Sequence, residues 1–246
     1  MAMPAEAGRV RLRPTLKTSL AAGLVFLLLV GLGSWQVQRL FWKADLIETR
    51  ETRSAMEPVS LLALGEGPES FEFRRVSAHG RFLHDQEIYL AARSLNGRPG
   101  YHLLTPFALE GGGSVLVNRG WIPLEKKLPE ARPEGQLEGQ LTLEGIFRMP
   151  PEPGWFTPDN APGEDVWYWI DLRAMALRLG APLEPFVVEA GPEPNPGGLP
   201  IGGQTRITLA NDHLQYAITW YGFALTLAVI FVLYHRRRRP AKAGDE

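Results

Sequence analysis

The chain has 246 residues, a formal net charge of −1 and no cysteine. Without cysteine it forms no disulfide, and thiol redox chemistry and a Cys-ligated copper site are excluded. The five methionines are scattered along the chain, which also argues against a Met-rich copper site.

The N-terminal part combines a basic segment over 1–17 with an apolar stretch over 18–38. A helix rises about 1.5 Å per residue, so roughly 20 residues cross a hydrocarbon core of about 30 Å. We therefore predict a first transmembrane helix over 18–38. A cleaved secretory signal also begins with a basic segment and an apolar run. No A-x-A cleavage site follows Gly33, and Trp35 lies at the interfacial level, which favours an uncleaved anchor.

A second apolar stretch predicts a transmembrane helix over 213–234, followed by a basic tail over 235–246. By the positive-inside rule, the basic flanks place both termini in the cytoplasm and the middle of the chain on the exported side. Between the flanks, 17 Lys and Arg stand against 24 Asp and Glu. This acidic balance excludes nucleic acid as a partner, because its phosphates need cationic groups.

The middle of the chain begins with residues 39–56, which contain no Gly or Pro and predict a helical extension of the first span. Residues 57–190 alternate β-favouring segments with turns such as Asn96-Gly97 and Gly111-Gly112-Gly113. We predict strands over 73–82, 87–92, 101–109, 115–122, 141–147, 166–170 and 186–189, and a helix over 172–179 stopped by Gly180. The predicted fold is a membrane hairpin of two transmembrane helices enclosing one exported β-rich (α+β) domain, an antiparallel barrel or sandwich.

Two proline-rich segments interrupt this pattern. Residues 149–163 predict an ordered loop, because Trp155 and Phe156 would otherwise expose apolar area to water. Residues 191–212 are rich in Pro and Gly and predict a tether back to the membrane.

Catalytic signatures are missing from the sequence. It contains no Walker loop, no G-x-S-x-G elbow, no H-E-x-x-H and no G-x-G-x-x-G after a strand. The carboxylates show no spacing that singles out a pair. We therefore expect no enzyme and no catalytic residue.

One constellation lies at the start of the second span. Asp212 and Gln215 resemble a capping box that starts the helix at His213, and helical spacing places His213, Tyr216 and Trp220 on one face. The positive end of the helix dipole favours the neutral imidazole that a metal needs, so His213 is a candidate axial ligand for haem iron. The alternative is an interfacial His in an aromatic belt, and physical reasoning alone favours that alternative.

Four motifs together have a family resemblance. They are residues 33–39 with Trp42-Lys43, residues 100–106, residues 117–123 and residues 211–220. In this order they resemble the signatures of the surfeit locus protein 1 family, and the resemblance extends from the first span to the second.

This resemblance implies an assembly factor, or chaperone, for cytochrome c oxidase of the respiratory chain. Bacterial members of the family are implicated in supplying haem a to subunit I, which implies that His213 ligates haem iron while Tyr216 and Trp220 line the site. The implied partners are subunit I, haem A synthase and the lipid bilayer. Arg119-Gly120-Trp121 match a motif without an assigned function, which we interpret as a strand and turn. The N-terminus lacks a long amphipathic Ser- and Arg-rich helix, so we expect a bacterial inner-membrane protein with a periplasmic domain.

Two other functions remain open at this stage. The protein could be a scaffold that stabilises subunit I without binding haem, and bound haem in the purified protein would separate the two. A membrane-tethered enzyme is the third hypothesis, and the missing catalytic motifs argue against it.

Overall fold

The computed structural model describes residues 16–64 and 67–236, with side chains up to Tyr234. The chain divides into two compact units. One is a sheet unit of Ile47–Leu209, and the other is a helical unit formed by residues that precede and follow the sheet unit in the sequence. The predicted basic segments over 1–17 and 235–246 lie almost wholly outside the described residues.

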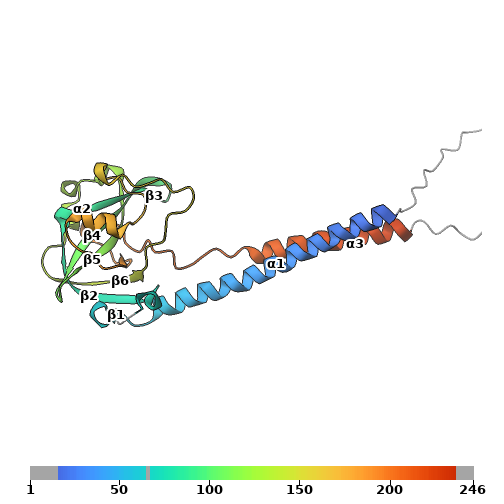
Figure 1. The fold of residues 1–246 in the computed structure, drawn as a ribbon, viewed down its shortest axis with the longest axis horizontal. Coiled ribbons are helices and arrows are strands. Elements are labelled where there is room, and N and C mark those ends of the chain that lie inside the picture. The colour runs from blue at the N-terminus through green and yellow to red at the C-terminus, as the bar shows by residue number, and fades with distance from the viewer. Residues whose placement is uncertain (1–15, 65–66, 237–246) are drawn as a thin grey trace, which may run out of the picture. The chain divides into compact units, whose positions relative to one another are not determined.

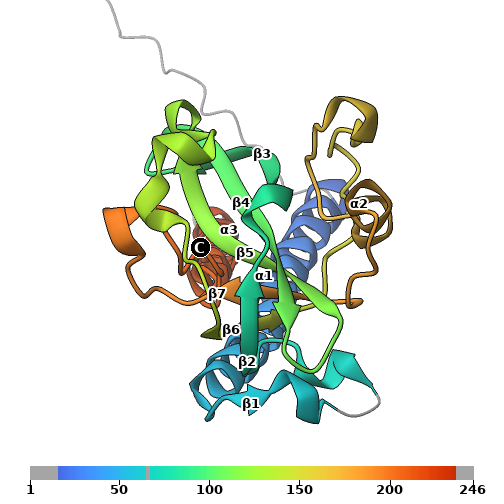
Figure 2. The same ribbon diagram turned by 90° about the vertical axis from the view of Figure 1, so that its left-hand side faces the viewer.

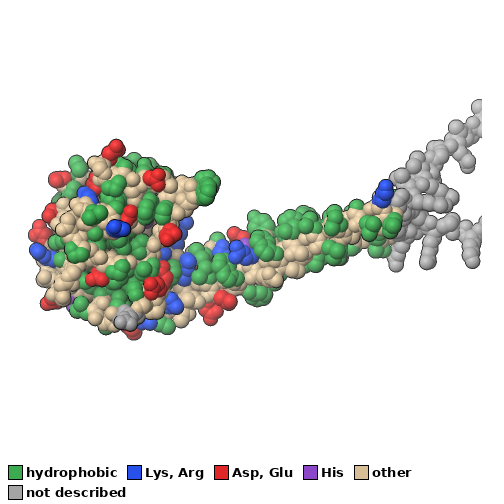
Figure 3. Space-filling view, viewed as in Figure 1, with side chains coloured by type: hydrophobic (Ala, Val, Ile, Leu, Met, Phe, Trp, Pro, Cys, Tyr) green, Lys and Arg blue, Asp and Glu red, His purple; other side chains and the backbone are tan. Residues whose placement is uncertain are grey.

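The helical unit consists of two long helices, α1 (Leu16–Ala55) up to Leu46 and α3 (His213–Arg236), which lie side by side (Figure 1). They run antiparallel, because Asn211 contacts Leu40 at one end while Phe26 and Phe231 line one apolar cavity at the other. Figure 3 shows apolar side chains along much of the surface of this pair. Among the described helices, these two are long and apolar enough to cross a bilayer.

The first helix continues without a break to Ala55, through the segment predicted as a helical extension. From Ile47 onward it belongs to the sheet unit. There Arg53 donates a hydrogen bond to the Glu72 carbonyl at 3.1 Å, and the Arg50 guanidinium lies 4.4 Å from the centre of the Phe73 ring.

The sheet unit is built on one seven-stranded sheet (Figure 2). Its strands follow the order β1-β2-β6-β7-β5-β4-β3, and a further pairing of β2 with β4 closes five of them into a circuit. The strands are β1 (Val59–Ser60), β2 (Arg75–Phe82), β3 (Ile88–Leu95), β4 (Arg98–Leu109), β5 (Ser114–Pro123), β6 (Leu141–Arg148) and β7 (Val187–Ala190).

Both predicted hairpin turns are confirmed. Asn96 and Gly97 join β3 to β4 with positive φ angles of 50° and 79°, as a two-residue hairpin turn requires. The Gly111-Gly112-Gly113 run joins β4 to β5, and Gly112 and Gly113 have φ angles of 92° and 82°.

Three details of the sheet differ from the prediction. The sheet is not purely antiparallel, because β5 pairs with β7 and β1 with β2 in parallel. The long connection from β5 to β7, which contains β6 and α2, makes a parallel return possible. The short β1 was not predicted, and residues 166–170 form only isolated bridges, at Val166 and Trp167.

The hydrophobic core has two parts on opposite faces of the central strand β5. Val115 and Val117 belong to one cluster with Phe107 and Phe147, whereas Leu116 belongs to another. This second cluster contains Ile88, Leu90, Leu104, Trp167, Met175 and Val187. Successive side chains on a strand point to opposite faces, so β5 is buried on both.

Helix α2 (Leu172–Leu179) covers the second cluster and has the predicted bounds. The Asp171 carboxylate accepts a hydrogen bond from the Ala174 backbone at 3.0 Å and caps the first turn. Gly180, with φ of 66°, ends the helix in the left-handed conformation that glycine adopts without strain. Met175 is the helix's fully buried residue.

The proline-rich loop over 149–163 contradicts the reason given for its order. Trp155 is 96% exposed and Phe156 95% exposed, so neither ring is shielded from water. The loop is held at its base instead, where Asn160 accepts a hydrogen bond from the Tyr168 backbone at 2.8 Å.

The segment predicted as a tether over 191–212 is in fact docked along its first half. The backbones of Trp121 and Ile201 exchange two hydrogen bonds of 2.9 Å, and Gly203 donates one to Ala190 at 3.1 Å. The sequence did not predict these backbone contacts, because Pro and Gly content indicates local backbone preference and not pairing between distant segments.

Candidate functional site

Within the helical unit, the motif of residues 211–220 at the start of α3 contacts the first span, including the motif of residues 33–39 on α1. His213 Nδ1 lies 2.7 Å from the Gln36 side-chain oxygen, and the Asn211 amide donates to the Leu40 carbonyl at 3.2 Å. Eight residues beyond His213, the Tyr221 hydroxyl lies 3.0 Å from the Ser34 hydroxyl. Two stretches more than 170 residues apart in sequence therefore form one polar site, which we call the helix-pair site.

The Gln36 contact defines which nitrogen of His213 remains available. The amide oxygen can only accept, so Nδ1 carries the proton in this hydrogen bond. When the ring is neutral, this arrangement leaves the lone pair on Nε2, for which the structure shows no hydrogen bond with a described residue. Such an outer-shell partner is the usual way in which proteins orient a metal-ligating imidazole.

The structure brings two of the three predicted site residues onto the face that packs on α1. His213 and Trp220 are half-buried there, in line with Ala217 and Ala224, which are 2% and 3% exposed. Tyr216, by contrast, is 54% exposed. The half-buried and buried positions of α3 repeat as 213, 217, 220 and 224, and Tyr216 lies beside this stripe.

Sequence reasoning missed Gln36, Ser34 and Tyr221 as parts of this site. Gln36 and Ser34 belong to the first quoted motif, but only the register of the two helices shows that they face α3. Gly33 is buried beneath the Tyr221 ring, which would lie only 2.8 Å from a Cβ atom at this position. A Cβ atom at Gly31 would meet nothing within 4 Å.

Aromatic and cationic side chains follow along α1. The Arg39 guanidinium lies 4.7 Å from the Trp42 ring centre and 6.0 Å from the Trp35 ring centre. Arg and Trp at this level of an apolar helix are typical of the zone where a span enters the polar interface.

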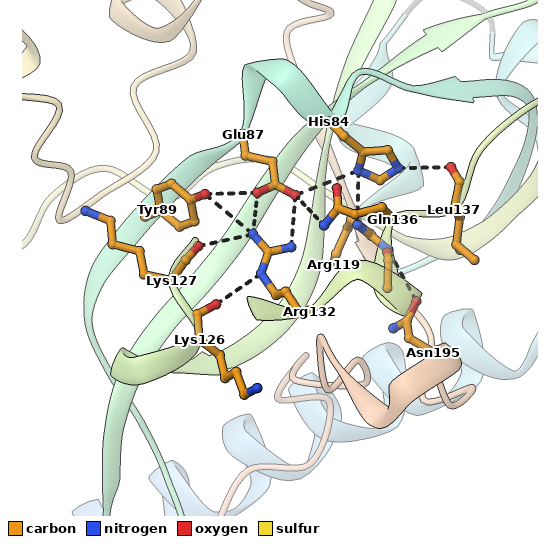
Figure 4. Close-up of polar contacts among 11 residues, drawn as sticks. His84, Glu87, Tyr89, Arg119, Lys126, Lys127, Arg132, Gln136, Leu137 and Asn195 are labelled. Carbon is orange, nitrogen blue, oxygen red and sulfur yellow. Dashed lines mark hydrogen bonds and ion pairs between the residues drawn. The ribbon is translucent and has the colours of Figure 1, made fainter. Parts of the chain in front are cut away.

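In the sheet unit, the motif of residues 117–123 contains Arg119, which is 2% exposed and part of a buried charged cluster (Figure 4). Its Nη2 donates to the Gly135 carbonyl at 2.6 Å and to Asn195 at 3.4 Å. Its guanidinium also lies 4.6 Å from the centre of the Phe82 ring. Arg119 therefore connects β5 to two segments that follow it in the chain.

The centre of this charged cluster is the ion pair of Glu87 and Arg132, which are 4% and 3% exposed. Both carboxylate oxygens of Glu87 accept hydrogen bonds from Arg132, one of them at 3.0 Å from Nη1. The Tyr89 hydroxyl donates to the same carboxylate at 3.0 Å, and His84 Nδ1 lies 3.7 Å from it. Figure 4 shows these side chains converging on Glu87.

The protonation states in the cluster follow from burial and from these contacts. Burial raises the pKa of the Glu87 carboxyl, but hydrogen bonds from His84 and Arg132 and the Arg132 charge outweigh it and lower the pKa to about 2. Burial and the Glu87 charge raise the pKa of Tyr89. Burial lowers the pKa of Arg119 to about 10. At neutral pH the cluster thus holds one carboxylate and two guanidinium cations, each with partners inside the domain, which is the arrangement of a structural clamp.

The position that follows Arg119 leaves no room for a side chain, and glycine occupies it. Gly120 has φ of 112°, and a Cβ there would collide with the carbonyl of Ile201. Trp121 then forms the paired hydrogen bonds to Ile201. The Arg119-Gly120-Trp121 stretch was predicted as a strand and turn, and all three residues lie within strand β5. The stretch also holds the docked segment.

Within the part of the chain that the structure describes, no group of three or more His, Cys, Asp or Glu side chains is placed to hold a metal ion.

Comparison with known proteins gives consistent matches. A protein-family model described as the SURF1 family matches residues 23–225. Surfeit locus protein 1 of Mus musculus is 38% identical over 235 residues, which cover 87% of this chain and 76% of the mouse protein. Surfeit locus protein 1 of Homo sapiens is 38% identical over 226 residues, 85% of this chain and 75% of the human protein.

The SURF1-like protein of Monosiga brevicollis is 40% identical over 227 residues, which cover 87% of this chain and 85% of that protein. All three relatives are eukaryotic, so the bacterial origin expected from the sequence stays a prediction. The family match begins within α1, ends within α3 and includes both halves of the helix-pair site as well as the Arg119 motif. The chain belongs to the SURF1 family.

Proposed function

We propose that the protein spans a bacterial inner membrane twice and exports its sheet unit to the periplasm. The antiparallel contacts of α1 and α3 support a hairpin, because a chain that leaves and returns through the same bilayer must have antiparallel spans. The basic flanks of the sequence support cytoplasmic termini. In the exported part, the closed circuit of strand pairing fits the barrel form of the predicted fold.

Cysteine labelling tests this topology without background, because the chain has no cysteine. Ser70→Cys, on the exposed surface of the sheet unit, should react with a membrane-impermeant maleimide in intact cells. Ala243→Cys, in the C-terminal tail, should react only after lysis. Labelling of Ala243→Cys in intact cells would contradict the hairpin with cytoplasmic ends.

We further propose that the protein is an assembly factor for cytochrome c oxidase that binds haem a and assists its delivery to subunit I. The observation that carries this proposal is the His213–Gln36 hydrogen bond, which occupies Nδ1 and leaves Nε2 as the nitrogen that could bind iron. Haem a would be cargo that supplies the oxidase with redox chemistry, and no covalent step by this protein is required. Haem A synthase, which makes this cargo, is the proposed donor partner.

The residues fit such a group in three respects. His213 would supply one axial ligand, and the half-buried Trp220 ring would cover part of the macrocycle. Gln36 would orient the imidazole through Nδ1. Tyr216, being largely exposed, would make a smaller contribution than the sequence predicts.

The test is the haem content of protein purified from a strain that makes haem a, measured by its optical spectrum. His213→Ala should reduce bound haem to background, because it removes the iron ligand. Gln36→Leu should weaken haem retention about tenfold, since it removes only the group that orients the ring. Tyr216→Phe should have little effect. The matched control is His79→Ala, an exposed histidine on β2.

A non-haem scaffold is the second candidate, because a half-buried His–Gln hydrogen bond between two spans also serves as a structural contact. On this account His213→Ala and Gln36→Leu should lower helix-pair stability and leave the haem content of the purified protein unchanged. Equal haem in wild type and His213→Ala would put the scaffold first.

A further inference from the structure

A pocket of about 490 Å³ lies in the sheet unit, apart from the buried charged cluster. A polar row forms part of its lining, with one residue from each of four neighbouring strands: Arg148 on β6, Glu189 on β7, Asn118 on β5 and His102 on β4. Two of these residues, His102 and Asn118, come from sequence motifs that the proposed function does not use. We call this the basic pocket.

Three arginines line the basic pocket, against one carboxylate. They are Arg93, Arg148 and Arg206, and the carboxylate is Glu189. Residues 47–209 as a whole contain 15 Lys and Arg against 22 Asp and Glu. A cationic pocket in an acidic domain concentrates the field on an anion that enters it.

The arginines differ in how far they are neutralised. Arg148 donates to Glu72 at 2.9 Å and lies 3.7 Å from Glu189. Arg93 donates to the Tyr168 carbonyl at 3.1 Å and has no carboxylate partner among the described residues. Arg206 is exposed and forms no hydrogen bond or ion pair with a described residue. Two guanidinium groups are thus available to an anion.

The backbone of β3 is distorted where Arg93 enters the pocket. Its register against β4 shifts between Leu90 and Arg93, and Ala92 has φ of 55°, which a residue with a side chain rarely adopts. A bulge of this kind changes the direction of the side chains that follow it. Strained backbone of this kind clusters at active sites and ligand sites.

The polar row of the pocket also contains His102 and Asn118, whose side chains can donate hydrogen bonds. Asn118 is 5% exposed, and its amide nitrogen lies 3.3 Å from His102 Nδ1 while its oxygen accepts from the Gly120 backbone at 3.1 Å. Nδ1 of His102 therefore accepts, and Nε2 carries the proton. Burial and the nearby Arg93 charge lower the pKa of His102 to about 4, so the ring is neutral at pH 7.

The lining also contains an apolar part with one aromatic ring. It includes Leu90, Pro151, Trp169 and Ile170. Arg forks match the planar geometry of a carboxylate, and an aromatic wall favours a flat body beside it.

We propose that the basic pocket binds a small molecule that carries a carboxylate on a flat apolar body. Arg93 and Arg206 hold the carboxylate, and Trp169 packs against the body. This site does not depend on haem binding by the helix-pair site, because all of its residues belong to the sheet unit.

The test is isothermal titration calorimetry of the detergent-purified full-length protein with 2-naphthoate as the probe. Binding should be saturable, and it should weaken about tenfold in Arg206→Gln and in Arg93→Gln through loss of a charge-assisted hydrogen bond. Arg206→Gln is the cleaner variant, since Arg93 also holds the Tyr168 backbone. Arg173→Gln, an exposed change on α2 outside the pocket, should bind like wild type and corrects for partition into detergent.

Two further probes separate the chemical requirements. Uncharged 2-naphthamide should bind at least tenfold more weakly than 2-naphthoate, and so should inorganic phosphate, which lacks the apolar body. His213→Ala should bind 2-naphthoate like wild type even if it loses haem. Equal binding by wild type, Arg206→Gln and Arg93→Gln would overturn the proposal, and phosphate binding as tight as that of 2-naphthoate would overturn the requirement for an apolar body.

Discussion

Replacing Glu87 by Gln should destabilise the sheet unit by about 3–5 kcal/mol, because it leaves the buried Arg132 guanidinium without its counter-charge. For a chain of this size we expect the melting temperature of the unit to fall by about 10 °C. The measurement is thermal unfolding of the full-length protein, followed by tryptophan fluorescence.

The double variant Glu87→Met with Arg132→Met separates the ion pair from packing. Removing both charges should cost less than the sum of the two single changes, because no unpaired charge then remains buried. Arg98→Met is the matched control, since Arg98 and Glu125 form an exposed ion pair whose loss should cost less than about 1 kcal/mol. Additive effects of the two buried changes would contradict the clamp interpretation.

Acid should weaken the same ion pair in the wild type. The pKa of Glu87 is about 2 in the folded protein, below its ordinary value of 4.5, so the folded state binds the proton less readily than the unfolded chain. The stabilisation from the carboxylate is therefore fully present above pH 4.5 and is lost as the pH falls towards 2. Between these values, the melting temperature of wild type should fall more steeply than that of Glu87→Gln.

The second large effect is expected from Gly120→Ala. The added Cβ would collide with the Ile201 carbonyl, at a backbone angle that already disfavours alanine. We expect a loss of about 2–4 kcal/mol, which combines backbone strain with the loss of the two Trp121–Ile201 hydrogen bonds. Hydrogen exchange at the Ile201 amide should accelerate more than exchange in β6.

Gly139→Ala provides the control for Gly120→Ala. Gly139 also has a positive φ, of 80°, but a Cβ there would meet nothing within 4 Å. This control should cost only the conformational penalty of about 1 kcal/mol and leave Ile201 protected. Equal effects of the two changes would mean that the docked segment contributes nothing to stability.

The sequence predicted features that depend on short stretches of chain. The length of two apolar runs predicted α1 and α3, Asn96-Gly97 predicted a hairpin turn, and Gly180 predicted the end of α2. Each signal is local, since backbone preference and apolar length are properties of neighbouring residues. For the same reason His213 could be identified as a candidate from its helix position alone.

Only the tertiary structure decided which distant residues meet. It placed Gln36 against His213 and Gly33, not Gly31, against Tyr221, because the register of two antiparallel helices depends on all of their contacts at once. It also docked Ile201 on Trp121 and left Trp155 in water, against the prediction from composition. The sequence by itself determined the two apolar helices, the β-rich middle and a candidate histidine. The partners of that histidine, the buried charged cluster and the basic pocket arise from contacts between segments far apart in the chain, which no local pattern encodes.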